Sequence, residues 1–212
     1  MILHINGMAE ELSTGGMNYN MASISDFGYD DQINLKLLNR SIYVLHGMLE
    51  EDIALDAIKW LILQNGIKSD FPITIYINSL GGNLHNALAL VDLIKLSKRT
   101  VRTIAIGGIH SAAFLVFVAG TRGSRYIGPN TSSMIHQYEH IIEGKHHELK
   151  ASLKEGDNYN ARMQSVLVSS SDLSPQGVGE NLLRETNVFL TSQEMLDFGL
   201  ADHILGENEL TV

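Results

Sequence analysis

Short runs of β-branched and apolar residues alternate with stretches of helical periodicity through the middle of this chain. Such runs are typical of buried strands, and apolar residues recurring every three or four positions are typical of amphipathic helices. Because strand and helix alternate at short intervals, the pattern predicts an α/β fold with a mostly parallel sheet and right-handed crossovers. The predicted strands are residues 41–45, 73–77, 101–106 and 125–127, and the predicted helices are 53–62, 84–94 and 112–119.

The last third of the chain is more helical. Residues 144–170, 175–186 and 192–198 predict three further helices, and residues 202–205 close the pattern. Gly156-Asp157-Asn158 lies inside the first of these helices and weakens the case for one continuous helix.

Composition limits the class of protein. The chain has 212 residues, which suits one domain with a sizeable core. Its 44% hydrophobic and 18% charged residues exclude the disordered and collagen-like classes. A net charge of −9 argues against a broad nucleic-acid surface. The absence of cysteine excludes a thiolate nucleophile and a disulfide framework, and it fits a cytoplasmic location.

The most apolar stretch, residues 103–120, carries Gly107, Gly108, His110 and Ser111 in its middle. This interruption predicts a strand, a turn and a buried helix instead of a membrane span. The first seven residues lack both a basic region and a long apolar run, so they do not predict a secretory signal. Residues 1–31 are polar without a sustained period, which predicts an N-terminal arm.

Two glycine pairs, Gly81-Gly82 and Gly107-Gly108, each follow a predicted strand and precede a predicted helix. Turns of this kind allow backbone N–H groups to point at an anion or an oxyanion, and they also serve tight packing between strand and helix. Neither pair carries the lysine of a phosphate-binding loop or the complete dinucleotide fingerprint. The sequence therefore predicts no nucleotide cofactor.

Two residue types near these turns suit acyl-transfer chemistry. Ser111 begins a predicted helix, where a serine serves either as a helix cap or as a nucleophile. His136 lies beside apolar residues. A histidine in such a position either has a structural role or transfers protons near neutral pH. His140, His146 and His147 follow, but the order of ligands typical of zinc peptidases is absent, so no metal is predicted.

Four segments together resemble the ClpP family, the proteolytic subunits of ATP-dependent Clp proteases. The segments are residues 75–82, 107–120, 125–137 and 189–202, and the resemblance covers about 32–205. The step of 25 residues from Ser111 to His136 is the same as in the family. The resemblance implies repeated ββα units with a mostly parallel sheet, as in the ClpP and crotonase folds. It also implies a flexible axial segment at 1–31 and a peptidase domain at 32–212, with a protruding helical handle at about 138–170.

The same resemblance implies roles for individual residues. Ser111 is expected to be the nucleophile, His136 the general base, and the N–H groups of Gly82 and Ala112 the oxyanion hole. An unfolded polypeptide is expected to lie as an added strand beside the enzyme. The expected substrate-binding residues are Gly81, Asn83, Leu84, Gln137 and Tyr138.

Partners are implied in the same way. The family forms a homo-oligomer of two stacked heptameric rings, which an AAA+ unfoldase supplies with unfolded polypeptide substrates. Neither a nucleic-acid partner nor a membrane partner is expected.

One departure from the family bears on activity. Asn187 stands where the family has the aspartate of its catalytic triad. An amide oxygen accepts the Nδ1–H of His136, but it supplies no full charge to stabilise an imidazolium. Asp172, Asp197 and Asp202 are alternative third members.

This departure leaves two functions open. The first is an active serine endopeptidase, and the alternative is a weakly active or inactive ring subunit that pairs with an active ClpP paralogue. A crotonase-type acyl-CoA enzyme shares the glycine-turn oxyanion hole but explains neither Ser111 nor His136.

Overall fold

The computed structural model describes residues 28–207, and its secondary structure confirms the predicted α/β class with a mostly parallel sheet. The chain divides into two compact units, residues 1–36 and 37–212, and the candidate site belongs to the second. The N-terminal segment predicted at 1–31 lies outside the described residues except for 28–31. The elements are α2 (Tyr29–Asn39), β1 (Ile42–His46), α3 (Glu51–Gly66), β2 (Ile73–Ser79), α4 (Leu84–Lys95), β3 (Val101–His110), α5 (Ala112–Val118), β4 (Arg125–Ile127), β5 (Ser132–Ile135), α6 (His146–Ser170), α7 (Pro175–Asn181), β6 (Val188–Leu190), α8 (Ser192–Asp197) and β7 (His203–Ile204).

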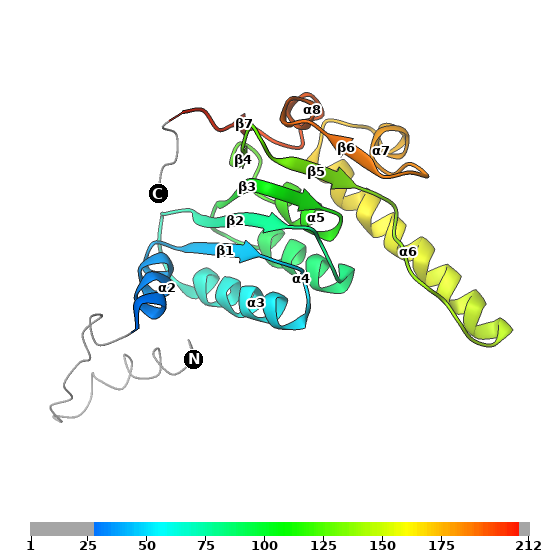
Figure 1. The fold of residues 1–212 in the computed structure, drawn as a ribbon, viewed down its shortest axis with the longest axis horizontal. Helices are drawn as coiled ribbons and strands as arrows, with labels where there is room; N and C mark the ends of the chain where they lie inside the picture. The colour runs from blue at the N-terminus through cyan, green and yellow to red at the C-terminus, as the bar shows by residue number, and fades with distance from the viewer. Residues whose placement is uncertain (1–27, 208–212) are drawn as a thin grey trace, which may run out of the picture. The chain divides into compact units, whose positions relative to one another are not determined.

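The sheet runs in the order β1-β2-β3-β4-β7, and all of these pairs are parallel. β5 pairs in parallel with the second half of β3, and β6 pairs antiparallel with β5. Helices α3, α4 and α5 run beside the sheet (Figure 1). Ile73, Ile75 and Ile77 of β2 are all buried, as the period of two along a strand requires when one face is covered. The core therefore lies between the sheet and these helices.

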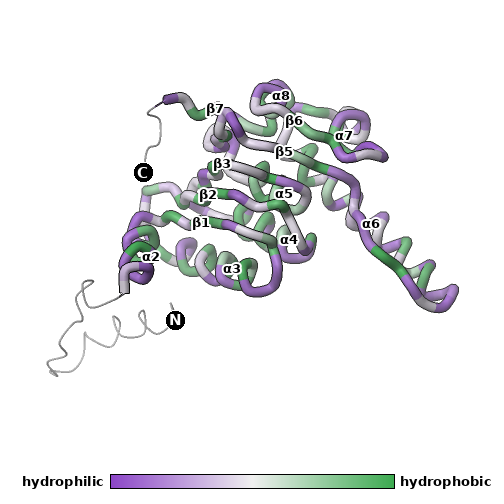
Figure 2. The backbone as a smooth tube through the Cα atoms, in the orientation of Figure 1, coloured by the Kyte–Doolittle hydropathy of each residue, from purple (hydrophilic) through white to green (hydrophobic). Residues whose placement is uncertain are grey.

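α4 and α5 show how local sequence produces this layer. The side chain of Asn83 caps α4 by accepting hydrogen bonds from the N–H groups of His85 and Asn86. The buried residues of α4 recur at helical spacing, so they lie on one face of the helix. Every residue of α5 is buried, and Figure 2 shows this helix as a hydrophobic stretch behind the sheet.

The predicted turn at Gly107-Gly108 is wrong, because both glycines lie within β3. Between the pairs Ile77–Ala105 and Ser79–Ile109, β2 has one residue and β3 has three, so β3 contains a bulge. The side chain of Asn78 occupies this bulge: its Oδ1 accepts a hydrogen bond from the Gly108 N–H at 3.1 Å. Gly107 has φ +69°, and a Cβ there would lie 2.7 Å from the same Oδ1, so only glycine fits.

α6 is one continuous helix of 25 residues and extends away from the sheet, with hydrophobic and hydrophilic residues alternating along it (Figures 1 and 2). Gly156 does not interrupt it. A Cβ at Gly156 would lie 2.8 Å from Cε1 of His140, so this glycine allows the segment before α6 to pack closely on the helix. The doubt about a continuous helix was therefore wrong, because the glycine serves a close approach instead of a break.

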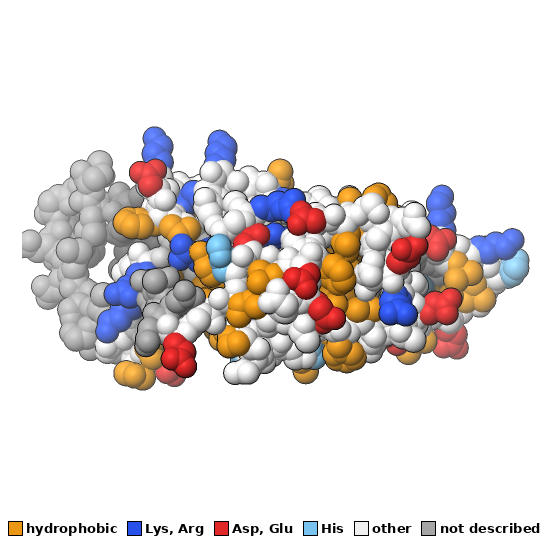
Figure 3. Space-filling model, turned by 90° about the horizontal axis from the view of Figure 1, so that it is seen from above, with side chains coloured by type: hydrophobic (Ala, Val, Ile, Leu, Met, Phe, Trp, Pro, Cys, Tyr) orange, Lys and Arg blue, Asp and Glu red, His pale blue; other side chains and the backbone are white. Residues whose placement is uncertain are grey.

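No helix within residues 28–207 is long and apolar enough to cross a membrane. The apolar stretch at 103–120 forms part of β3 and the whole of α5, so the predicted strand and buried helix are confirmed, although the glycines lie within the strand and not in a turn. On the face shown in Figure 3, acidic and basic side chains of the described residues are interspersed.

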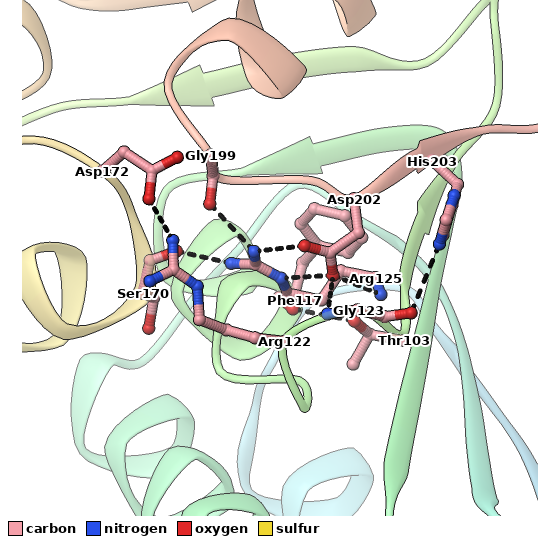
Figure 4. A network of polar contacts seen from close by, with 10 residues as sticks. All are labelled: Thr103, Phe117, Arg122, Gly123, Arg125, Ser170, Asp172, Gly199, Asp202 and His203. Atoms are coloured by element: carbon pink, nitrogen blue, oxygen red, sulfur yellow. Dashed lines mark hydrogen bonds and ion pairs between the residues drawn. The ribbon is translucent and has the colours of Figure 1, made fainter.

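Arg125 joins three distant parts of the chain from a fully buried position on β4 (Figure 4). Its guanidinium donates to the carbonyl of Ser170 at the end of α6 at 2.5 Å, and to the carbonyl of Gly199 at 2.9 Å. It also donates to both carboxylate oxygens of Asp202, at 2.9 and 2.7 Å. A buried cation needs such partners, because leaving one unpaired away from water is costly.

The pKa of Asp202 lies below its usual range. Burial by itself raises it, but hydrogen bonds from the side chain and N–H of Arg125, together with the guanidinium charge, outweigh the burial. The folded state therefore favours ionised Asp202. The resulting stability is present above the unfolded pKa, near 3.9, and is lost as the pH falls through the lower folded pKa.

We predict that Asp202→Asn lowers the free energy of unfolding at pH 7 by about 3 kcal/mol, because Arg125 stays buried without its counter-charge. The loss should shrink as the pH falls below about 4, where wild-type Asp202 becomes protonated as well. Urea denaturation at pH 7 and at lower pH measures both effects. The control is Asp172→Asn, which breaks an exposed pair with Arg122 and should cost less than about 1 kcal/mol. Equal losses in the two variants would contradict the prediction.

Candidate active site

Ser111 lies between β3 and α5 in a strained backbone conformation, with φ 52° and ψ −121°. Its N–H donates to the carbonyl of Met134 at 2.7 Å, which ties it to β5. It occupies the N-cap position of α5, but its side chain makes no capping hydrogen bond. The hydroxyl points to a different partner, so the cap alternative does not account for this serine.

That partner is His136, whose Nε2 lies 2.8 Å from the Oγ of Ser111. The two residues are brought together by the pairing of β3 with β5, in which His110 faces Met134. Each candidate residue directly follows its strand, Ser111 by one position after β3 and His136 by one after β5. The sheet therefore converts a separation of 25 residues into direct contact.

The other ring nitrogen of His136 fixes its tautomer. Nδ1 lies 2.5 Å from the main-chain carbonyl oxygen of Gln137. Because a carbonyl only accepts, Nδ1 carries the proton, and Nε2 is left to accept a hydrogen bond from the Ser111 hydroxyl. This is the protonation state that a general base for serine requires.

Asn187 lies directly before β6 and is exposed. In the antiparallel register of β5 and β6, Ile135 faces Val188, so one further step sets His136 opposite Asn187. Among the hydrogen bonds of residues 28–207, however, none joins the Asn187 side chain to His136. The strand register brings the two residues to neighbouring positions, and Gln137 takes the hydrogen bond.

The three alternative aspartates are engaged elsewhere. Asp202 binds the buried Arg125, and Asp172 pairs with Arg122, as Figure 4 shows. Asp197 accepts a hydrogen bond from Gln193 at 2.9 Å. None of these contacts involves His136.

Of the expected oxyanion donors, Ala112 directly follows Ser111, and Gly82 directly follows Gly81, which approaches Ser111 closely. Ala112 is the first residue of α5, where helix N–H groups have no partner within the helix. Leu49 donates to the carbonyl of Gly81 at 2.7 Å and accepts from the N–H of Asn83 at 3.2 Å. Leu49 and Gly82 thus form a parallel β-bridge, in which the N–H of Gly82 points away from Leu49.

Both glycines of the first pair are required by close approach. A Cβ at Gly81 would lie 2.9 Å from the Cβ of Ser111 and 2.7 Å from the carbonyl oxygen of His110. A Cβ at Gly82 would lie 2.8 Å from the backbone nitrogen of Leu49. Gly81 therefore allows this turn to touch the nucleophile segment, and Gly82 allows it to pack against Leu49.

The remaining expected substrate-binding residues have structural contacts of their own. The side chain of Asn83 caps α4, and that of Leu84 is buried in the core. Gln137 donates through Nε2 to the carbonyl of Leu183 at 2.9 Å. The Tyr138 N–H donates to the side chain of Asn160 at 2.8 Å, so this main-chain donor is already engaged.

An aromatic cluster links Tyr138, one of the expected substrate-binding residues, with α6 and with the start of α4. The ring of Tyr138 stacks on His140 and packs against Tyr159 of α6, with centroids 5.0 and 4.6 Å apart. Tyr159 in turn contacts His85, in the first turn of α4, edge to face. The sequence carried no periodic signal for this cluster, because its members come from three separate segments.

His110 was also missed as a neighbour of the site. Its Nε2 lies 2.9 Å from the hydroxyl of Ser132, and its ring meets Phe189 edge to face. Burial lowers the pKa of His110, which favours the neutral ring beside Ser111. Its position directly before the candidate nucleophile was the one available signal. Within the described part of the chain, no group of three or more His, Asp or Glu side chains is placed to hold a metal ion.

Comparisons with known proteins identify the family of this chain. The sequence profile of the family described as Clp protease matches residues 28–208. The ATP-dependent Clp protease proteolytic subunit 2 of Treponema denticola is 27% identical over 175 residues, which cover 82% of this chain and 86% of that protein. A solved structure, an asparagine-to-aspartate mutant of ClpP1 from Listeria monocytogenes, is 27% identical with a TM-score of 0.74 and covers 84% of this chain and 98% of that one. The chain therefore belongs to the Clp protease family.

Proposed function

We propose that this chain is the proteolytic subunit of a Clp-type protease, a serine endopeptidase that cleaves unfolded polypeptides. The observation that carries the proposal is the 2.8 Å contact between Ser111 Oγ and His136 Nε2, with the proton of the ring on Nδ1. A serine hydroxyl aimed at an accepting imidazole is the arrangement that nucleophilic acyl transfer requires.

The proposed mechanism uses the residues already placed. Ser111 Oγ attacks the peptide carbonyl while His136 Nε2 takes its proton, and the same proton then passes to the leaving amine. The N–H groups of Gly82 and Ala112 stabilise the oxyanion, at about 3 kcal/mol of barrier for a donor. A water molecule then hydrolyses the acyl-enzyme by the same proton transfers. The site needs no metal or cofactor for these steps.

Asn187 is the proposed second acceptor for the Nδ1–H of His136. The strand register supports this assignment, because one further step of the β5–β6 ladder sets it opposite His136. Both Asn187 and the Gln137 carbonyl are neutral, so neither stabilises a charged imidazolium as a carboxylate does. This observation favours the second candidate function, a weakly active ring subunit that pairs with an active ClpP paralogue.

The assembly is proposed from the family. Two stacked heptameric rings would enclose the sites, α6 would contact the opposite ring as the handle, and an AAA+ unfoldase would feed substrate in a cytoplasmic setting. Substrate would lie as an added strand beside residues 82–84 and 138–142. The ring contact between Tyr138 and Tyr159 joins the second of these segments to α6.

Ser111→Ala should abolish covalent labelling by a fluorophosphonate probe and cleavage of a short fluorogenic peptide, because the attacking oxygen is removed. Mass spectrometry of the labelled chain identifies the modified residue. Ser165→Ala, at an exposed position on α6, is the control and should label as the wild type does. Labelling that persists in Ser111→Ala would remove the basis for the proposed mechanism.

Asn187→Asp should raise peptide turnover by at least about tenfold, because a carboxylate stabilises the imidazolium that forms during catalysis; the reverse change in a related triad costs about 10⁴. Steady-state kinetics of the assembled protein measures the change. Asn158→Asp, which makes the same substitution at an exposed position of α6, is the control. A fall in turnover would show that Asn187 serves a different purpose.

Native mass spectrometry tests the assembly without reference to activity. Two heptameric rings predict a species of fourteen copies of the 23.4 kDa chain. A stable monomer at micromolar concentration would contradict the ring assembly.

A further inference from the structure

The hydrogen bond that orients His136 comes from the next residue in the chain. The Nδ1–H of His136 has one proton to donate, and it reaches the main-chain carbonyl of Gln137 at 2.5 Å. Asn187, one register step away, therefore competes with Gln137 for the same proton. Whichever acceptor holds Nδ1–H decides how firmly Nε2 stays aimed at Ser111.

The side chain of Gln137 is itself bonded to a second segment of the chain. Its Nε2 donates to the carbonyl of Leu183 at 2.9 Å. Leu183 is itself anchored, because its N–H bonds the carbonyl of Val178 in α7 at 2.9 Å. Val178 is fully buried, so this chain of contacts runs from the histidine to the core.

The Gln137–Leu183 contact also ties the histidine to the segment that carries Asn187. Leu183 lies in the connection between α7 and β6, and Asn187 is the last residue of that connection. One bond thus connects the residue whose carbonyl holds His136 with the start of the segment that presents the competing amide.

We propose that Gln137 is a positioning residue for His136: its carbonyl holds the Nδ1 proton, and its side chain locks that carbonyl against Leu183. This inference rests on the proposed function, since it concerns how the candidate base is aimed. It also replaces the expected substrate-binding role of Gln137, because both its carbonyl and its side-chain donor are already engaged. Gln137 acts through His136 and does not touch the reacting atoms.

The test is Gln137→Met, which keeps the length of the side chain and removes its donor. We expect kcat to fall about tenfold, a part of the roughly 10²–10⁴ that a general base contributes, while KM changes less than about twofold. Labelling of Ser111 by the fluorophosphonate probe should slow by the same factor. A rise in KM with kcat unchanged would restore the substrate-binding role and overturn the proposal.

The chain offers a matched control for this variant. Gln164 on α6 also donates through Nε2 to a main-chain carbonyl, that of Pro175, at 2.9 Å. Gln164→Met therefore removes the same kind of bond without touching His136, and kcat should stay at the wild-type value. If Gln137→Met and Gln164→Met behave alike, the Gln137 bond is only structural and the proposal fails.

The Asn187→Asp background separates the two acceptors. A carboxylate at position 187 should take the Nδ1 proton, so Gln137→Met should cost less than about twofold in this background, against about tenfold in the wild type. An equal cost in both backgrounds would overturn the proposal.

A crystal structure of the wild-type assembly tests the geometry without activity. Nδ1 of His136 within about 3.2 Å of the Gln137 carbonyl supports the proposal, and Nδ1 on the Asn187 amide instead overturns it. The proposed function fails separately, if neither the wild type nor Asn187→Asp shows labelling or cleavage that depends on Ser111.

Discussion

The candidate site depends on the bulge in β3. Before the bulge β3 pairs with β4, and after it β3 pairs with β5. The Asn78 side chain holds the extra residues, and glycine at 107 leaves room for it. Without this change of partner β5 would not lie beside the end of β3, and the 2.8 Å contact between Ser111 and His136 would not form.

A second constraint lies outside the candidate site. Arg125 gathers the end of α6, the turn at Gly199 and the Asp202 carboxylate around one buried guanidinium. This contact anchors the C-terminal end of α6, while the other end of that helix extends away from the sheet (Figure 1). The C-terminal end of α6 is therefore fixed in place, and Tyr138, which contacts Tyr159 in the middle of this helix, joins it to the candidate site.

Local patterns predicted most of the architecture and part of the site. The strands and helices through 125–127 follow from the period of apolar residues, and Ser111 and His136 were identifiable by residue type and by the resemblance. Gly107-Gly108 was misread because a glycine pair in a turn and one in a bulge have the same local sequence, and only the side chain of Asn78 distinguishes them. Gly156 was misread because the His140 ring that requires it lies outside the helix.

The sequence by itself determined the α/β alternation and supplied a serine, a histidine and an asparagine as candidate site residues. Only the tertiary structure decided which acceptor holds the histidine. The register of β5 and β6 sets Asn187 opposite His136, yet Nδ1 bonds the Gln137 carbonyl, and the Gln137 side chain bonds the carbonyl of Leu183. The physical reason is that tenths of an ångström decide between an acceptor next to His136 in the chain and one on the paired segment, and residue order carries no such distances.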